Sequence, residues 1–191
     1  MPRAVPGGPG LRRLDRADFP PARQAATLLL VYPDRTGDLT VPLTVRHAEL
    51  REHPGEISLP GGTVDASDAS REAAALREAW EEVGVDPRTV RIAGTLDDIW
   101  IPVSNFELRP FVGTAAVRPE LTPHTDEVAE IVELPLHLLL TDEIVGDELI
   151  EGPGWSLRAA AYRHGGHRIW GATARTLAMF AAVLHEAGLS V

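Results

Sequence analysis

Three glutamates stand close together in the middle of the chain, at a spacing suited to holding a ligand. Glu78, Glu81 and Glu82 occupy positions i, i+3 and i+4, and a helix with about 100° between successive residues would carry all three on one side. Apolar residues of the same segment would then fall on the opposite side: Ala73, Leu76, Trp80 and Val83. We therefore expect a helix that buries its apolar side and presents three carboxylates on the other.

A solvated acidic face is the simplest alternative for such a run of charge, but these glutamates are placed unfavourably for it. In the last turns of a helix the dipole disfavours each anion by roughly 0.3–1 kcal/mol, and like charges at i and i+4 cost about a few tenths of a kcal/mol more. A hard divalent cation, Mg²⁺ or Mn²⁺, prefers carboxylate oxygens and would reverse both penalties. Arg77, about 40° from Glu81 around the helix, is placed to orient a ligating carboxylate. The pattern therefore favours a metal site.

The elements that must position these residues can be read from local signals. The helix is expected from residue 70 to 83, ended by Gly84, because glycine suits a left-handed cap. A second helix is expected near Ala172, with apolar residues at helical spacing: Leu177, Phe180, Ala181 and Leu184. Strands are expected at 27–32, 39–46, 90–96, 106–117 and 127–133. Strands with intervening helices predict an α/β fold, in which helices cover a mixed sheet.

The segment around the glutamates resembles a known motif. Residues 77–85, R-E-A-W-E-E-V-G-V, resemble the second half of the Nudix box, G-x5-E-x7-R-E-U-x-E-E-x-G-U, although Ala79 stands where a bulkier aliphatic residue is usual. Gly62 matches the first glycine, whereas Asp68 replaces the usual glutamate and is separated from Arg77 by eight residues instead of seven. The resemblance implies a Nudix-type α/β/α sandwich with a mixed central sheet. It also implies metal ligands at Glu78, Glu81 and Glu82, with Arg77 holding a ligating glutamate in place.

The segment just upstream resembles a second motif, the coenzyme A signature of the coenzyme A pyrophosphatase subfamily, L-L-T-x-R-[SA]-x3-R-x3-G-x3-F-P-G-G. Residues 43–62 match its threonine, both arginines, the glycine and the final P-G-G, and depart from it at His47 and Leu59; Pro42 replaces its first leucine. The longer Nudix box is usual in this subfamily, and 168–175 resembles its I-W-G-x-T-A stretch. The resemblance therefore covers most of residues 23–180.

The signature's residues suit a polyphosphate ligand on chemical grounds. Arg46 and Arg51 can make bidentate phosphate contacts, and Gly61 and Gly62 let backbone N–H groups approach anionic oxygens. Taken alone, the arginines would equally suit a solvated strand edge, and the glycines would suit ordinary turns. The two motifs in tandem favour substrate binding by all four residues.

Composition excludes several other kinds of protein. The chain has 191 residues, a net charge of −10, no cysteine, and arginine at all 18 cationic positions. It therefore has no disulfide framework, thiolate zinc site, P-loop lysine or Schiff-base lysine. The acidic balance argues against a nucleic-acid partner, and no apolar run is long enough to span a membrane. We expect a cytoplasmic protein with a mobile lead at 1–23 and one domain at 24–191; the oligomeric state is left open.

The resemblance implies metal-assisted hydrolysis of the pyrophosphate of coenzyme A, or of its acyl or oxidised forms, to 3′-phosphoadenosine 5′-phosphate and 4′-phosphopantetheine. Glu127 is the candidate general base, and a surface acid at a strand start is the alternative. The departures at His47 and Leu59 leave room for another small-molecule substrate, ADP-ribose or NADH, and a non-catalytic nucleotide sensor is a further alternative. His164 and His167, which flank Gly165-Gly166, favour a hairpin over a zinc site because no third ligand stands near them.

Overall fold

The computed structural model describes residues 15–49, 55–124, 126–152 and 155–189. Arg51, one of the two arginines expected to bind substrate, lies outside the described residues. The domain boundary expected after residue 23 stays a prediction. Within the described part, Phe19 packs edge-on against Trp100 and Arg16 pairs with Glu107. Residues 16–19 are therefore in contact with strands of the main sheet.

A mixed sheet of eight strands forms the centre of the fold. Its path runs β3-β2-β1-β7-β5, with β4 and β8 joined to β1 and β2 and with β6 joined to β7. The strands are β1 Arg23–Pro33, β2 Leu39–Arg46, β3 Ile57–Ser58, β4 Gly61–Thr63, β5 Arg91–Thr95, β6 Ile99–Ile101, β7 Phe106–Thr114 and β8 Val128–Pro135. β1 and β7 pair in parallel, and the other pairs described in this sheet are antiparallel. The prediction of an α/β fold with a mixed sheet is confirmed.

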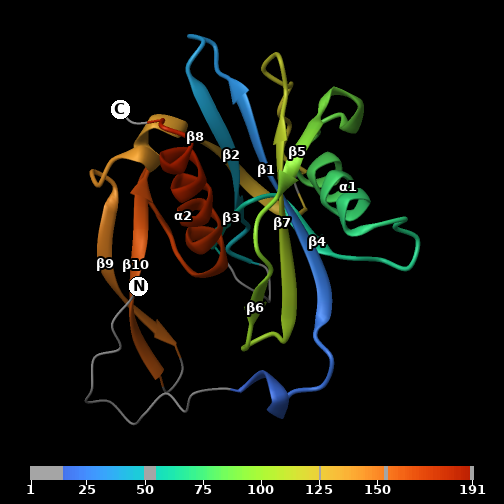
Figure 1. Cartoon of the computed structure of the whole chain (residues 1–191), viewed down its shortest axis with the longest axis vertical. Helices are drawn as coiled ribbons and strands as arrows, with labels where there is room; N and C mark the ends of the chain where they lie inside the picture. The colour runs from blue at the N-terminus through green and yellow to red at the C-terminus, as the bar shows by residue number, and fades with distance from the viewer. Residues whose placement is uncertain (1–14, 50–54, 125, 153–154, 190–191) are drawn as a thin grey trace.

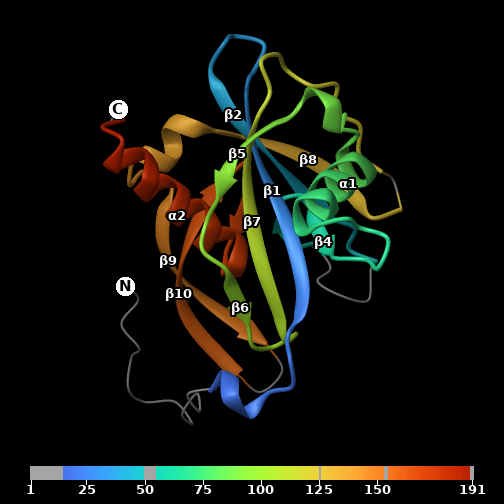
Figure 2. The same cartoon turned by 45° about the vertical axis from the view of Figure 1, so that its right-hand side comes forward.

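Two helices cover opposite faces of this sheet, α1 (Arg71–Val83) and α2 (Gly171–Glu186). Figures 1 and 2 show one helix on each side of β1 and β7. Alternate residues of β1 supply the two cores: Ala26, Leu28, Leu30 and Tyr32 lie in the cluster with α1, and Leu29 and Val31 in the cluster with α2. Because both faces are covered, β1 is a continuous apolar run instead of an alternating one.

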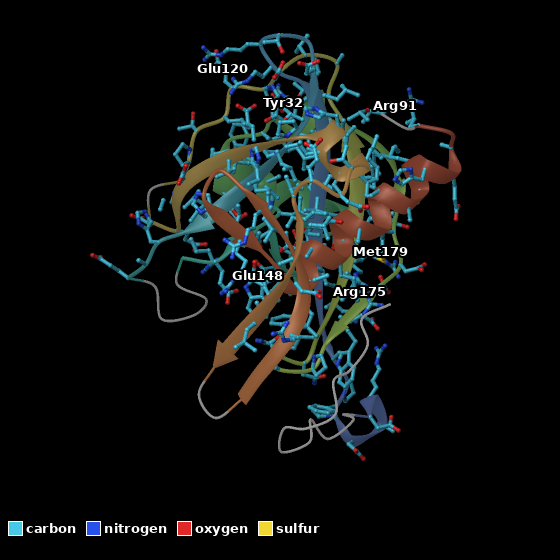
Figure 3. The ribbon with its side chains drawn as sticks, turned by 90° about the vertical axis from the view of Figure 1, so that its left-hand side faces the viewer. Tyr32, Arg91, Glu120, Glu148, Arg175 and Met179 are labelled. Carbon is cyan, nitrogen blue, oxygen red and sulfur yellow. The ribbon has the colours of Figure 1, made fainter. Side chains whose placement is uncertain are left out.

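A long hairpin forms a second, three-stranded sheet beside α2, with the order β11-β10-β9. Its strands are β9 Val145–Gly152, β10 Trp155–His164 and β11 His167–Ile169, and Figure 3 shows the hairpin extending beyond the end of α2. The hairpin expected at the glycine pair is confirmed, since Gly165 and Gly166 join β10 to β11 with φ of 58° and 81°. His164 lies 3.1 Å from the Glu133 carbonyl oxygen, and His167 lies 3.3 Å from the Glu130 carboxylate.

Four short or polar strands, β3, β4, β6 and β9, were not expected from the sequence, and β10 and β11 were expected only as a hairpin around the glycine pair. The strand expected at 106–117 ends at Thr114, and the described residues between β7 and β8, 115–124 and 126–127, form a loop, called below the 115–127 loop. Within the described residues, no helix has the length and apolar character needed to cross a bilayer. The expected cytoplasmic location stays a prediction.

Candidate active site

Helix α1 carries the glutamates, and its two ends form as the sequence predicts. The Ser70 hydroxyl accepts a hydrogen bond from the Ala73 N–H at 3.1 Å, which caps the first turn. Gly84 ends the helix in the left-handed region, with φ of 75°, and its N–H donates to carbonyls of the last turn.

The face that α1 buries differs from the expected one. The residues turned to the sheet are Ala74, Ala75, Ala79, Glu82 and Val83. Trp80, expected in the core, is 54% exposed, and Glu82, expected on the open face, is only 6% exposed. The small alanines let the helix lie close to β1, and of the larger residues expected in the core Val83 is buried and Leu76 is partly buried against the same cluster. The three glutamates therefore do not share one solvated face.

The glycine pair that precedes α1 lies directly against two of the glutamates. β4 pairs antiparallel with β1, with Gly61 opposite Thr27 and Gly62 opposite Ala26. The Gly61 N–H donates to Glu82 Oε2 at 3.1 Å. A Cβ on Gly62 would lie 2.5 Å from Glu78 Oε1, so glycine is required for this close approach. In this structure the Gly61 N–H serves the protein's own carboxylate, and its role as a substrate ligand stays a prediction.

Arg77 connects the acidic residues of this region. Its Nε and Nη2 donate to the two carboxylate oxygens of Asp68, each at 3.0 Å. Its Nη1 donates to Glu78 Oε1 at 2.9 Å and to Glu81 Oε2 at 2.8 Å. The guanidinium lowers the pKa of Asp68 through these hydrogen bonds, and it fixes the positions of Glu78 and Glu81.

Asp68 is a positioning residue that the sequence reasoning undervalued. Compared with the Nudix box, the sequence has the shorter aspartate in place of glutamate and one additional residue before Arg77. Even so, the side chain of Asp68 is only 5% exposed, and both of its carboxylate oxygens accept hydrogen bonds from Arg77. The loop between Gly62 and α1 absorbs the additional residue. The spacing alone could not indicate this, because a loop of either length can return an acid to the same arginine.

The carboxylates line one cavity of about 590 Å³. Glu78, Glu81 and Glu82 lie on its α1 side and Glu127 lies on the side of the 115–127 loop. Two backbone bonds fasten this loop to the end of α1: Thr122 N–H to Val83 O at 3.0 Å, and His124 N–H to Glu82 O at 2.9 Å. The fold therefore brings Glu127, 45 residues beyond Glu82, to the same cavity.

Burial in this cavity disfavours the charged form of two of its carboxylates, those of Glu78 and Glu82. Burial raises the pKa of Glu82 from 4.5 to about 8, opposed by the Gly61 N–H and by the charge of Arg46, and assisted by the charges of Glu78 and Glu127. Burial likewise raises the pKa of Glu78, opposed by its bond to Arg77. A cation bound in this cavity would favour the charged form of both carboxylates.

Arg46 is the substrate-binding candidate that can be placed. It is the last residue of β2, its N–H donates to the Glu56 carbonyl at 2.9 Å, and its charge acts on Glu82. Its Nε is buried and has no hydrogen-bond partner among the described residues. A buried donor of this kind is costly unless a ligand satisfies it.

The donor set fits a hard divalent cation in chemical type, since four carboxylates meet in one cavity. In the ranges that the structure describes, however, no three acidic or histidine side chains already form a metal-binding group. The hydrogen bonds explain this: Glu78 and Glu81 are bonded to Arg77, and Glu82 is bonded to Gly61. These bonds use one oxygen of each carboxylate, Glu78 Oε1, Glu81 Oε2 and Glu82 Oε2, and the role of the three glutamates as metal ligands stays a prediction.

Comparison with known proteins agrees with this geometry. The NUDIX domain profile matches residues 22–151. The chain is 43% identical over 114 residues to "Uncharacterized Nudix hydrolase NudL" of Pectobacterium atrosepticum, covering 60% of this chain and 58% of that protein. It is 35% identical over 176 residues to "Nudix hydrolase 15, mitochondrial" of Arabidopsis thaliana, covering 88% of this chain and 60% of that protein. The match thus spans about three fifths of the length of these relatives.

A solved structure, that of a MutT/nudix family protein from Enterococcus faecalis, shares the fold with a TM-score of 0.54 and 13% sequence identity, covering 93% of this chain and 71% of the other. The mixed sheet between two helices, the glycine pair of β4 and the glutamates of α1 agree with the profile match. The chain belongs to the Nudix family.

Proposed function

We propose that this protein is a metal-dependent diphosphatase that hydrolyses the pyrophosphate of coenzyme A, including acyl or oxidised forms. The observation that carries the proposal is the position of Arg46. This arginine of the upstream signature acts electrostatically on Glu82 of the Nudix box and keeps a buried donor without a described partner. Nudix hydrolases generally use divalent cations, here expected to be Mg²⁺ or Mn²⁺.

The proposed reaction is attack of water on one phosphorus of the pyrophosphate. The bridging oxygen leaves with the other phosphoryl group, and the products are 3′-phosphoadenosine 5′-phosphate and 4′-phosphopantetheine. The cation, held by Glu78, Glu81 and Glu82, would neutralise pyrophosphate charge and lower the pKa of a bound water.

The chain's own residues have distinct roles in this proposal. Arg46 binds a substrate phosphate, and Arg51, whose position the structure does not describe, is proposed to bind another. Arg77 holds Glu78 and Glu81 by its two Nη1 bonds. Glu127 accepts the proton of the attacking water, because it lines the same cavity as the three glutamates of α1.

The role of Glu127 has a separate test. Glu127→Gln is expected to lower kcat about 100-fold or more and to leave the KM for coenzyme A within about threefold. Glu130→Gln, an exposed acid on β8, is the matched control and should change neither. An unaltered kcat in Glu127→Gln would assign the base to another residue.

Two alternatives differ in substrate or in chemistry. A Nudix enzyme for ADP-ribose or NADH would use the same carboxylates without needing the coenzyme A signature. A nucleotide sensor would bind its ligand without cleaving it, but such a protein has no need for four carboxylates whose charges oppose one another.

The substrate assignment is tested by comparing coenzyme A with ADP-ribose in wild type and Arg46→Ala. We expect Arg46→Ala to raise the KM for coenzyme A about tenfold or more, and to raise the KM for ADP-ribose much less. Arg91→Ala is the matched control, since Arg91 is an exposed arginine at the start of β5. Equal effects of Arg46→Ala on both substrates would argue against a coenzyme A site.

A further inference from the structure

Trp80 of α1 has an exposed position that the chemistry above leaves unexplained. Its indole is 54% exposed, and it stands in the chain directly before Glu81 and Glu82. A lone exposed apolar side chain needs no explanation, but this one lines the carboxylate cavity together with the glutamates. It therefore has a position from which it can contact a substrate.

A second cavity of about 400 Å³ adjoins the first. Trp80, Gly84 and Thr122 line both cavities, so the indole stands between them. A ligand that runs from the carboxylates into the second cavity must pass along Trp80. The second cavity therefore continues the candidate active site.

Both cavities are lined by carboxylates, and they differ in the arginine that acts on them. The second cavity is lined by the carboxylates of Asp86 and Glu120 and has no cation among its described lining residues. The nearby Arg88 is already bound to Asp86 through its Nε and Nη2, at 2.6 to 3.1 Å. The charge of Arg46 acts instead on Glu82 of the first cavity, and its Nε has no hydrogen-bond partner among the described residues. A phosphate is favoured at Arg46 and disfavoured beyond Trp80.

We propose that Trp80 and the second cavity hold the uncharged, amide-bearing arm of the substrate, which for coenzyme A is the pantetheine arm. This inference rests on the proposed function. Coenzyme A has a 3′-phosphate on its adenosine side of the pyrophosphate and a long neutral chain on the other. The indole face covers the aliphatic part of that chain, and the carboxylate of Glu120 suits its amide N–H groups as an acceptor. The adenosine side, with its additional phosphate, then lies toward Arg46.

The test separates the two halves of the substrate by measuring the binding of each product with calorimetry. The ligands are 4′-phosphopantetheine and 3′-phosphoadenosine 5′-phosphate, each titrated with Mg²⁺ present. The proteins are wild type, Trp80→Ala, Trp80→Phe and Val183→Ala. Val183 is a matched control because it is a 49% exposed apolar residue of α2, on the opposite face of the sheet.

We expect Trp80→Ala to raise the Kd of 4′-phosphopantetheine about tenfold, equivalent to about 1.4 kcal/mol, and to leave the Kd of the adenosine product within about twofold. Trp80→Phe should keep most of the affinity, and Val183→Ala should change neither Kd. Weakening of the adenosine product alone, equal weakening of both, or no weakening in Trp80→Ala would overturn the inference, as would a wild type that does not bind 4′-phosphopantetheine. Turnover of coenzyme A by wild type is measured separately, so an active enzyme with unaffected product binding refutes the Trp80 assignment alone.

Discussion

The two neighbouring glycines of β4 should respond in opposite ways to the same substitution. In Gly61→Ala the new Cβ would lie 2.6 Å from Thr27 Cα and 2.8 Å from Thr27 Cβ, and these atoms belong to the central strand β1. In Gly62→Ala the new Cβ would meet the Glu78 carboxylate instead, at 2.5 to 2.9 Å, and that group can turn aside. We therefore predict that Gly61→Ala lowers the stability of the fold and that Gly62→Ala lowers the activity.

The structure sets the size of each effect. The backbone of β1 cannot move away from the added methyl group cheaply, so Gly61→Ala should cost about 1–3 kcal/mol of unfolding free energy, which lowers the Tm of a domain of this size by roughly 2–12 °C. Gly62→Ala should lower the Tm by no more than about 2 °C. Because it displaces Glu78 by about an ångström, Gly62→Ala should lower kcat/KM about 10- to 100-fold.

The assay combines thermal unfolding of the metal-free protein with steady-state hydrolysis of coenzyme A. Gly94→Ala is the matched control, because Gly94 has no atom within 4 Å of its added Cβ among the described residues; both readouts should stay near wild type. If Gly62→Ala destabilised the protein as much as Gly61→Ala, or kept full activity, the contact between β4 and Glu78 would have no functional importance.

Three further predictions concern the charged residues. Glu82→Gln should remove nearly all turnover, measured by initial rates. The Tm of the metal-free protein should stay equal or rise, because a neutral amide suits the buried position better than a carboxylate. Normal activity in this variant would refute the metal assignment. Arg77→Lys should weaken Mn²⁺ binding about 10- to 100-fold, because lysine cannot hold Asp68 with two parallel bonds. Calorimetric titration with Mn²⁺ measures this. Arg88→Lys, which changes an arginine in an exposed ion pair, is the control and should bind Mn²⁺ as wild type does. Asp98→Asn should lower the Tm at pH 7. Arg109 and Arg71 lower the pKa of Asp98 in the folded protein below its ordinary value of 3.8. The charged carboxylate therefore stabilises the fold above pH 3.8, and this stabilisation is lost as the pH falls through the lowered pKa. A Tm difference from wild type that failed to shrink at low pH would contradict this.

Local signals predicted the elements that carry the chemistry. The Ser70 cap and Gly84 bracket α1 in the structure, and the apolar run of β1 lies in the central sheet as expected. The hairpin of β9 and β10 was not expected because charged residues interrupt its apolar pattern, as in Val145–Gly152. Its strands become recognisable only when they pair with each other.

The helix face was predicted wrongly for a physical reason. The angular spacing of apolar residues around the helix placed Trp80 inside and Glu82 outside, whereas close packing on β1 selects the small Ala74, Ala75 and Ala79. Glu82 is buried within that face because the Gly61 N–H meets it there. The spacing of residues along one helix cannot predict such a contact, because it depends on a strand from another part of the chain.

The central claim, that the carboxylate cavity cleaves coenzyme A, is tested most directly by chromatography of the products. Coenzyme A is incubated with Mg²⁺ or Mn²⁺ and wild type, with Glu82→Gln and an ADP-ribose reaction in parallel. We predict 3′-phosphoadenosine 5′-phosphate and 4′-phosphopantetheine in equal amounts from wild type, almost none from Glu82→Gln, and much slower release of AMP from ADP-ribose. Intact coenzyme A after incubation with either metal would contradict the claim, and cleavage of ADP-ribose alone would keep the Nudix chemistry but refute the coenzyme A assignment.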